Sequence, residues 1–220
     1  RKELAGTGIQ INGREHIISL YADDTLFYLA KPAESLPRLL SLLEKFGQIS
    51  GLYLNPNKSL LFPLGTLRNT PRRDLPVLSL RWEMNHFKYL GIMVAHSLKD
   101  RQALNIDRVV SGLQRSVEFW NTLPLSVIGR IAISKMVLLP RCLYYIQNTF
   151  DIIPRRVFQQ LNSLTVKLIW AGHRCRVARN TLTKSITDDG LAVPDLERYY
   201  YATQLGHTGY PAKTTGKRGS

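Results

Sequence analysis

Two adjacent acids, Asp23 and Asp24, interrupt an otherwise apolar and aromatic run between Leu20 and Leu29. Carboxylate oxygens are hard ligands of the kind that Mg²⁺ prefers, and proteins usually share Mg²⁺ between a few carboxylates and the phosphates of a substrate. The pair is therefore suited to binding Mg²⁺ beside a phosphate group. Because Asp is also one of the commonest turn residues, an ordinary acidic turn is an alternative interpretation of this stretch taken alone.

The acids must be held by a turn between two strands. Successive side chains of a straight strand point to opposite faces, so both acids face one site only if the chain turns there. We predict a hairpin with its carboxylates at the tip. A second hairpin turn is predicted at Asn12-Gly13, between Ile9-Gln10-Ile11 and Ile17-Ile18-Ser19-Leu20, because Asn-Gly is the strongest short hairpin signal.

The following residues change to a helical period. Apolar residues at spacings of three and four predict a helix that Ser35 caps and Gly51 ends, followed by a short strand at 52–54. Proline and glycine recur between residues 63 and 76, which predicts a loop. Residues 87–94 are typical of a strand bent at Gly91.

Beyond Asp100 the sequence predicts helices only. An apolar stripe runs from Ile106 to Trp120, a new helix starts near Ser126, and Pro140 should kink or end it. A further helix is predicted over Arg155–Trp170, and a last one after Pro194. Basic residues lie among these stripes, so they either follow phosphates or simply keep the helices soluble.

The composition indicates a basic globular chain. Of its 220 residues, 30 are Lys or Arg and 16 are Asp or Glu, which gives a formal charge of +14. A field of that sign favours nucleic acid as partner, with a merely soluble basic protein as the alternative. Two cysteines are too few for a disulfide framework. No apolar run approaches the ~20 residues that span a bilayer, and no signal-peptide pattern opens the chain.

Tyr21-Ala22-Asp23-Asp24 resembles the Tyr-x-Asp-Asp box of reverse transcriptases, and its continuation resembles that of non-LTR retrotransposons of the long interspersed element type. Further blocks follow in the family's order, and the resemblance extends to about Leu205. These blocks are residues 46–55 with Lys58-Ser59, residues 87–92, residues 129–131, Lys135-Met136 and residues 139–141.

The resemblance implies an α+β fold, the C-terminal part of a reverse transcriptase palm followed by an all-helical thumb. Residues 1–98 would be the partial palm, 99–170 the thumb, and 171–206 a basic segment with a helix. Residues 207–220 would be a disordered tail, because Gly, Thr, Lys and Pro dominate there.

The resemblance also implies an RNA-directed DNA polymerase with two Mg²⁺ ions. Asp23 would bind both metals, Asp24 would support the site, and Lys58 would help protonate the departing pyrophosphate. The partners would be an RNA template and a DNA primer, without a membrane, in the nucleus and cytoplasm. Residues expected to contact nucleic acid are Tyr21, the primer grip at Lys88, Tyr89, Leu90 and Gly91, and the thumb cations Arg115, Arg130, Lys135 and Arg141.

The family uses a third aspartate on an earlier strand. No Asp precedes Asp23, and the chain begins with Arg1. We therefore expect a fragment that is able to bind a primer–template and has little or no polymerisation activity alone. A non-catalytic nucleic-acid-binding remnant and an RNA-making, RNA-directed polymerase are the alternatives.

Overall fold

The computed structural model describes residues 4–69, 80–149 and 151–207. It mixes helices with small sheets and divides into two compact units, Arg1–Asn85 and His86–Ser220, each described here by itself. The prediction that the C-terminal residues form a disordered tail lies outside the described residues, except for residue 207. The division falls at residue 85, so the strands predicted as the primer grip belong to the helical unit.

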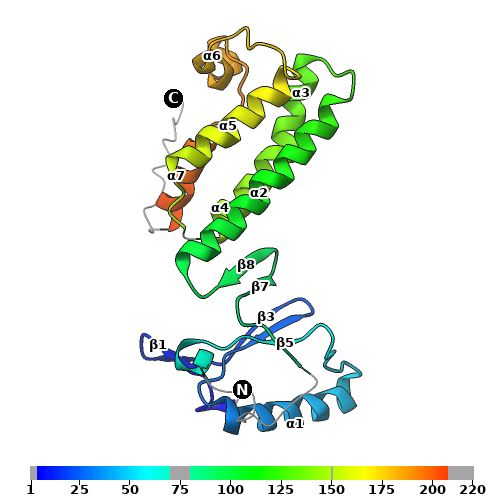
Figure 1. The fold of residues 1–220 in the computed structure, drawn as a ribbon, viewed down its shortest axis with the longest axis vertical. Helices are drawn as coiled ribbons and strands as arrows, with labels where there is room; N and C mark the ends of the chain where they lie inside the picture. Colours follow the sequence, from blue (N-terminus) through cyan, green and yellow to red (C-terminus); the bar gives the residue numbers. More distant parts are fainter. Residues whose placement is uncertain (1–3, 70–79, 150, 208–220) are drawn as a thin grey trace, which may run out of the picture. The chain divides into compact units, whose positions relative to one another are not determined.

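Two hairpins open the N-terminal unit (Figure 1). Strands β1 (Ile9–Ile11) and β2 (Arg14–His16) pair across Asn12-Gly13, and both turn residues have positive φ, 50° and 72°. The second hairpin joins β3 (Ile18–Tyr21) to β4 (Asp24–Phe27). Both turns lie where the sequence predicts them, but β1 pairs with β2 and not with the predicted residues 17–20, of which 18–20 pair with β4. The described strands form four separate two-stranded sheets, so the two hairpins do not share a sheet.

Helix α1 (Pro32–Ser50) packs Leu36 and Leu39 against Ile17 of the second hairpin. The left-handed Gly51, with φ of 74°, ends the helix as predicted. Its start was predicted wrongly. Pro32 begins the helix three residues before Ser35, because proline has a helix-compatible φ and needs no hydrogen bond in the first turn. The Ser35 hydroxyl instead donates to the Lys31 carbonyl at 2.6 Å.

The predicted strand at 52–54 is wrong. These residues form no strand and pair with none of the described strands, and Leu52 and Tyr53 are 69% and 60% exposed. The next strand, β5 (Leu60–Leu61), pairs in parallel with β6 (Arg81–Trp82). Between them lies η2 (Gly65–Asn69), a 3₁₀ turn in the predicted loop, and residues 70–76 of that loop lie outside the described ranges.

The helical unit begins with a third hairpin. Strands β7 (His86–Tyr89) and β8 (Ile92–Ala95) are antiparallel, and the turn between them has φ of 45° at Leu90 and 83° at Gly91. The sequence predicted one strand bent at Gly91, and that is wrong. Two successive positive φ values reverse the chain direction completely, so Gly91 closes a hairpin turn.

The rest of this unit is helical (Figure 1). Ser97 caps α2 and Ser126 caps α3, each accepting from a backbone N–H three residues later. The elements in chain order are α2 (Leu98–Asn121), α3 (Val127–Ile133), η4 (Ser134–Leu138), α4 (Leu139–Asn148), α5 (Arg155–Ile169), α6 (Arg179–Thr183), η5 (Ile186–Asp188) and α7 (Leu196–His207).

Pro140 does not end its helix. The segment η4 is a π-helix, in which the Leu139 N–H donates to the Ser134 carbonyl five residues earlier. This widened turn ends two residues before Pro140, so the N–H that the proline lacks falls where the regular hydrogen-bond ladder of the helix is already altered. The chain therefore remains helical from Val127 to Asn148.

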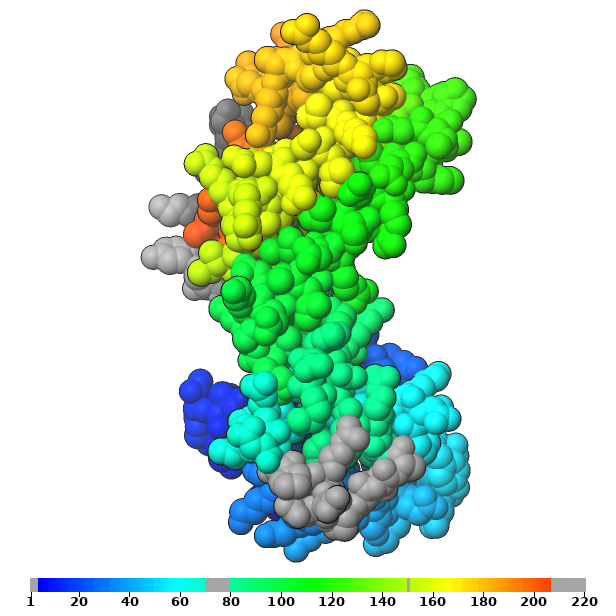
Figure 2. All heavy atoms as spheres, in the orientation of Figure 1, coloured from blue at the N-terminus to red at the C-terminus, as the bar shows by residue number. Residues whose placement is uncertain are grey.

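The core of the helical unit lies between α2, α4, α5 and α7. Helices α2 and α5 pack side by side, as their adjacent green and yellow surfaces show in Figure 2. The most buried side chains include Leu113 and Val117 of α2 and Leu168 of α5. A smaller cluster around Ile169, Leu182 and Val193 holds α6 against the end of α5. Among the described residues, none of the helices is long and apolar enough to cross a membrane.

Candidate functional site

The acidic hairpin presents both carboxylates at its tip. Tyr21 pairs directly with Asp24 across the strands, so their side chains share one face, and Ala22 and Asp23 form the turn itself. Both acids are exposed, and so is Tyr21, at 64%. The tip is therefore open to a ligand approaching from solvent.

Ala22 adopts a left-handed conformation with φ of 50°. This conformation brings a Cβ atom close to the backbone and costs about 1–2 kcal/mol for a residue other than glycine. Strained residues of this kind are concentrated at functional sites, where the surrounding structure holds them. A two-residue hairpin turn requires this positive φ at its first central residue, and Asn12 adopts it in the first hairpin, so the strain at Ala22 fixes the tight turn before the acidic pair.

Neither carboxylate has a partner in the described part of the chain. The ion pairs found there involve other acids, and no side-chain hydrogen bond reaches Asp23 or Asp24. Across residues 4–69, 80–149 and 151–207 no third His, Cys, Asp or Glu joins them in a cluster that could hold a metal ion. Two free carboxylates fit part of a Mg²⁺ ligand set, because Mg²⁺ accepts waters and phosphate oxygens in its remaining positions.

Lys58 lies in an exposed turn of the N-terminal unit. Its backbone N–H donates to the Asn55 carbonyl at 3.2 Å. No hydrogen bond or ion pair in the described structure joins its side chain to the acidic hairpin. The role expected for Lys58 stays a prediction.

The predicted primer-grip residues surround the turn of the third hairpin. Lys88 is exposed, while Tyr89 and Leu90 are half-buried. The Tyr144 hydroxyl of α4 donates to the Leu90 carbonyl. A Cβ atom at Gly91 would lie 3.2 Å from the Tyr144 ring, so this position has little room for a side chain. The turn is therefore anchored to the helical unit.

Three of the four predicted thumb cations remain accessible. Arg115 and Arg141 are exposed, and Lys135 in η4 is half-buried. The Arg141 guanidinium donates to the Gly112 carbonyl of α2 at 3.3 Å, which holds it beside that helix. Their contact with nucleic acid stays a prediction.

Arg130 does not fit the predicted phosphate contact. It is only 5% exposed, and its guanidinium donates to the Asn121 side chain at 2.7 Å and to three backbone carbonyls. These carbonyls are those of Leu123, Leu125 and Leu168, at 3.0, 3.2 and 3.3 Å. Carbonyls at helix C-termini carry partial negative charge, so the buried cation joins the ends of α2 and α5. We interpret Arg130 as a structural residue.

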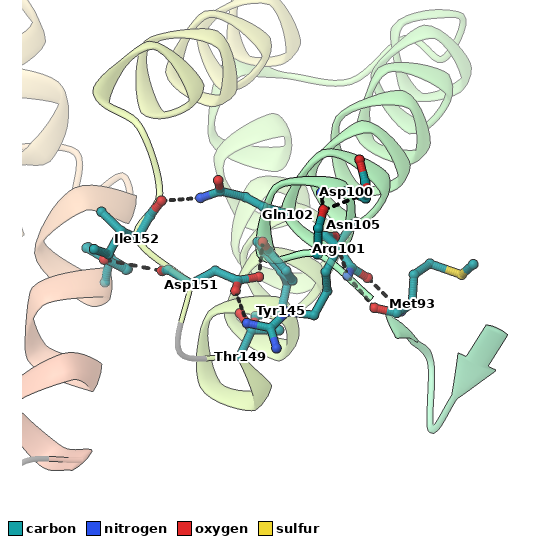
Figure 3. A network of polar contacts seen from close by, with 11 residues as sticks. Met93, Asp100, Arg101, Gln102, Asn105, Tyr145, Thr149, Asp151 and Ile152 are labelled. Atoms are coloured by element: carbon teal, nitrogen blue, oxygen red, sulfur yellow. Dashed lines mark hydrogen bonds and ion pairs between the residues drawn. The ribbon is translucent and has the colours of Figure 1, made fainter. Parts of the chain in front are cut away.

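Sequence reasoning missed a buried polar network in the helical unit (Figure 3). Asn105 of α2 is 3% exposed and hydrogen bonds to the backbone of Met93, and the fully buried Asp151 pairs with Arg101. One signal was present in the sequence. Asn105 precedes Val109 and Leu113 at four-residue spacing, so a polar side chain occupies a position of the apolar stripe.

A search of models of known protein families finds none that matches this chain.

Proposed function

We propose that this chain is part of an RNA-directed DNA polymerase of a non-LTR retrotransposon, which transfers nucleotides to a primer 3′ hydroxyl. One observation carries the proposal: two exposed, unpaired carboxylates lie at the turn of an antiparallel hairpin. The order of the sequence blocks that resemble reverse transcriptases supports the same interpretation.

In this proposal Asp23 and Asp24 are ligands of Mg²⁺. When bound, two such ions would activate the primer hydroxyl and neutralise the leaving pyrophosphate. Two metals need several carboxylates, and the described residues offer this pair alone at the hairpin. The intact enzyme would add the third aspartate that the family uses.

The other residues would position the nucleic acid. Tyr21 shares its face of the hairpin with Asp24, so its exposed ring would contact the strand next to the metal ligands. Lys88, Arg115, Lys135 and Arg141 would follow phosphates, which fix the register of a strand without reading its bases. Lys58 would donate a proton to the departing pyrophosphate.

A second candidate is a non-catalytic nucleic-acid-binding remnant of such an element. The formal charge of +14 supports this candidate as it supports the first one. Such a remnant would keep the cationic surface and have no need for a cation at the hairpin. Metal binding at Asp23 and Asp24 therefore separates the two candidates.

Primer extension by this chain tests the proposal. The chain is incubated with a labelled primer on an RNA template, deoxynucleotides and Mg²⁺, beside the variants Asp23→Asn and Asp24→Asn. We expect the primer–template to bind and little or no extension to occur. If the chain extends the primer and both variants abolish extension, the result would support nucleotide transfer at Asp23 and Asp24. It would contradict our expectation that this chain alone lacks a ligand that polymerisation requires. Extension that survives in both variants would refute the role of the hairpin.

A further inference from the structure

Asn105 fixes strand β8 to helix α2. Its side-chain oxygen accepts from the Met93 N–H, and its amide nitrogen donates to the Met93 carbonyl, both at 2.8 Å. The second amide hydrogen goes to the Arg101 carbonyl at 2.8 Å. Only one orientation of the amide satisfies both groups of Met93. The side chain thus pairs with β8 as a neighbouring strand would, inside the protein (Figure 3).

Tyr144 fixes the other end of the hairpin. Its hydroxyl donates to the Leu90 carbonyl, and its ring lies against Gly91. Leu90 has φ of 45°, which leucine adopts only at a cost in free energy. Two contacts from two helices therefore hold a strained turn and the strand that follows it.

The fixed hairpin aligns a cation of β7 with a cation of α2. Lys88 lies directly opposite Met93, so the two side chains share one face of the hairpin. The Arg108 guanidinium lies 2.9 Å from the Met93 sulfur, on that same face. Lys88 and Arg108 are both exposed. Arg115 follows Arg108 by seven residues, about two helical turns, on the same side of α2.

We propose that Asn105 and Tyr144 are positioning residues that hold Lys88 and Arg108 on one surface, which binds the phosphates of a nucleic-acid strand. The inference rests on the proposed function and adds Arg108 to its contacts. Exposed, flexible cations recognise phosphates without an apolar anchor. An acidic protein partner would need buried aromatic or apolar anchors. None of the exposed large apolar residues belongs to the face formed by His86, Lys88, Met93, Ala95 and Arg108.

Fluorescence anisotropy with a labelled RNA–DNA primer–template, measured over a series of salt concentrations, tests this proposal on the whole chain. Lys88→Ala and Arg108→Ala should each reduce the salt slope of log affinity by about 0.7–0.9, the release of counterions from one phosphate contact. Arg156→Ala, an exposed arginine of α5, is the matched control and should leave the slope unchanged.

Tyr144→Phe separates positioning from contact. It removes one hydroxyl and keeps the ring beside Gly91, so the helical unit should stay folded. We expect a loss of affinity of about threefold to tenfold, the equivalent of one hydrogen bond, with an unchanged salt slope. A purely structural role would lower thermal stability and leave the affinity of the folded chain unchanged, which would overturn the proposal.

Asn105→Ala provides a second test of positioning. The Met93 amide should exchange its hydrogen faster in this variant while the amides of α5 keep their protection. Wild-type affinity in that variant, despite fast exchange at Met93, would contradict the inference. So would wild-type salt slopes in both Lys88→Ala and Arg108→Ala. Equal binding of polyglutamate would show a general polyanion surface and also overturn it.

The outcomes separate this inference from the proposed function. Normal salt-slope losses in the Lys88 and Arg108 variants, without a cation bound at Asp23, would overturn the polymerase proposal and leave the phosphate surface standing. A cation bound at Asp23, together with wild-type binding in the Lys88, Arg108 and Tyr144 variants, would overturn the phosphate surface and leave the polymerase proposal standing.

Discussion

Arg101 and Asp151 form an ion pair in which the two partners differ sharply in exposure. The Asp151 side chain has no exposed surface, while 35% of the Arg101 side chain is exposed. The Tyr145 hydroxyl donates to the same carboxylate at 3.0 Å, and the Tyr200 hydroxyl donates to the Asp151 carbonyl at 3.4 Å. The connection between α4 and α5 is therefore tied to α2, α4 and α7 through one buried acid (Figure 3).

The difference in exposure predicts unequal effects of breaking the pair. Arg101→Met leaves a buried carboxylate with one remaining side-chain donor, and we expect it to lower the free energy of unfolding by about 3 kcal/mol. Asp151→Asn leaves a guanidinium that water reaches, and we expect a loss of about 1–2 kcal/mol. Urea denaturation followed by circular dichroism measures both.

The double variant completes this cycle. Arg101→Met with Asp151→Asn removes both charges, so it should be more stable than Arg101→Met alone. Equal losses in the two single variants would contradict the account of a buried acid with a half-solvated partner.

Arg130 and Arg115 should respond in opposite ways. Arg130→Met leaves three backbone carbonyls without their donor and should lower the free energy of unfolding by about 2–4 kcal/mol. Arg115→Ala removes an exposed side chain, so it should leave stability unchanged and weaken nucleic-acid binding. Denaturation and anisotropy on the same two variants test this. If Arg130→Met keeps the wild-type stability and weakens nucleic-acid binding, Arg130 contacts phosphate and our structural interpretation is wrong.

Alkaline pH should destabilise the helical unit through Cys142. Burial raises the pKa of its thiol from 9.0 to about 12. Burial and the Asp151 charge also raise the pKa of Tyr145. Above about pH 9 the unfolded chain therefore binds fewer protons than the folded chain, and stability falls as pH rises, by up to about 1.4 kcal/mol per pH unit for each group.

The matched cysteine variants isolate this effect. Cys142→Ala should flatten the fall in the free energy of unfolding between about pH 9 and pH 10, where the tyrosine contributes little. The exposed Cys175 provides the control, and Cys175→Ala should keep the wild-type pH dependence. A slope that Cys142→Ala leaves unchanged would contradict the burial of this thiol.

Two glycines of the helical unit predict opposite signs for the same substitution. Gly91→Ala places a Cβ atom at a φ of 83° and 3.2 Å from Tyr144, so it should lower stability by at least about 1 kcal/mol. Gly112→Ala, inside α2 with nothing within 4 Å, should raise stability by about 0.5–1 kcal/mol. Thermal unfolding of the two variants checks the difference. A neutral Gly91→Ala would contradict the hairpin turn.

Local patterns predicted most of the elements. Asn12-Gly13, the apolar stripe of α2 and the cap at Ser126 each act within a few residues, and the structure agrees with them. The predictions were wrong where the structure of a segment depends on a partner strand or on the conformation of an adjacent residue. Residues 52–54 alternate like a strand, but a strand forms only beside a partner, and no strand in the described part of the chain pairs with them. Gly91 was interpreted as a bend because the pattern does not reveal that Leu90 also has positive φ.

For the candidate site, the position of the acidic pair could be predicted from the sequence, while the exposure of the basic residues could not. The acidic pair could be placed at a turn because two adjacent side chains of a strand face one site only where the chain turns. Whether a basic residue faces solvent depends on packing, so Arg130 looked like Arg115 in the sequence while only Arg115 is exposed. The hydrogen bonds between Asn105 and the Met93 backbone depend on tertiary structure, which the periodicity of the sequence does not specify.

The central claim is that Asp23 and Asp24 together bind a divalent cation at the hairpin turn. Titration of the ¹⁵N-labelled chain with Mn²⁺ tests it most directly, because the paramagnetic ion broadens amide signals close to it. We predict selective broadening of residues 22–25, lost in Asp23→Asn and Asp24→Asn, at Mn²⁺ concentrations that leave the exposed pair Asp188 and Asp189 unaffected. Equal broadening at the two pairs, or broadening of residues 22–25 that survives both substitutions, would contradict the claim.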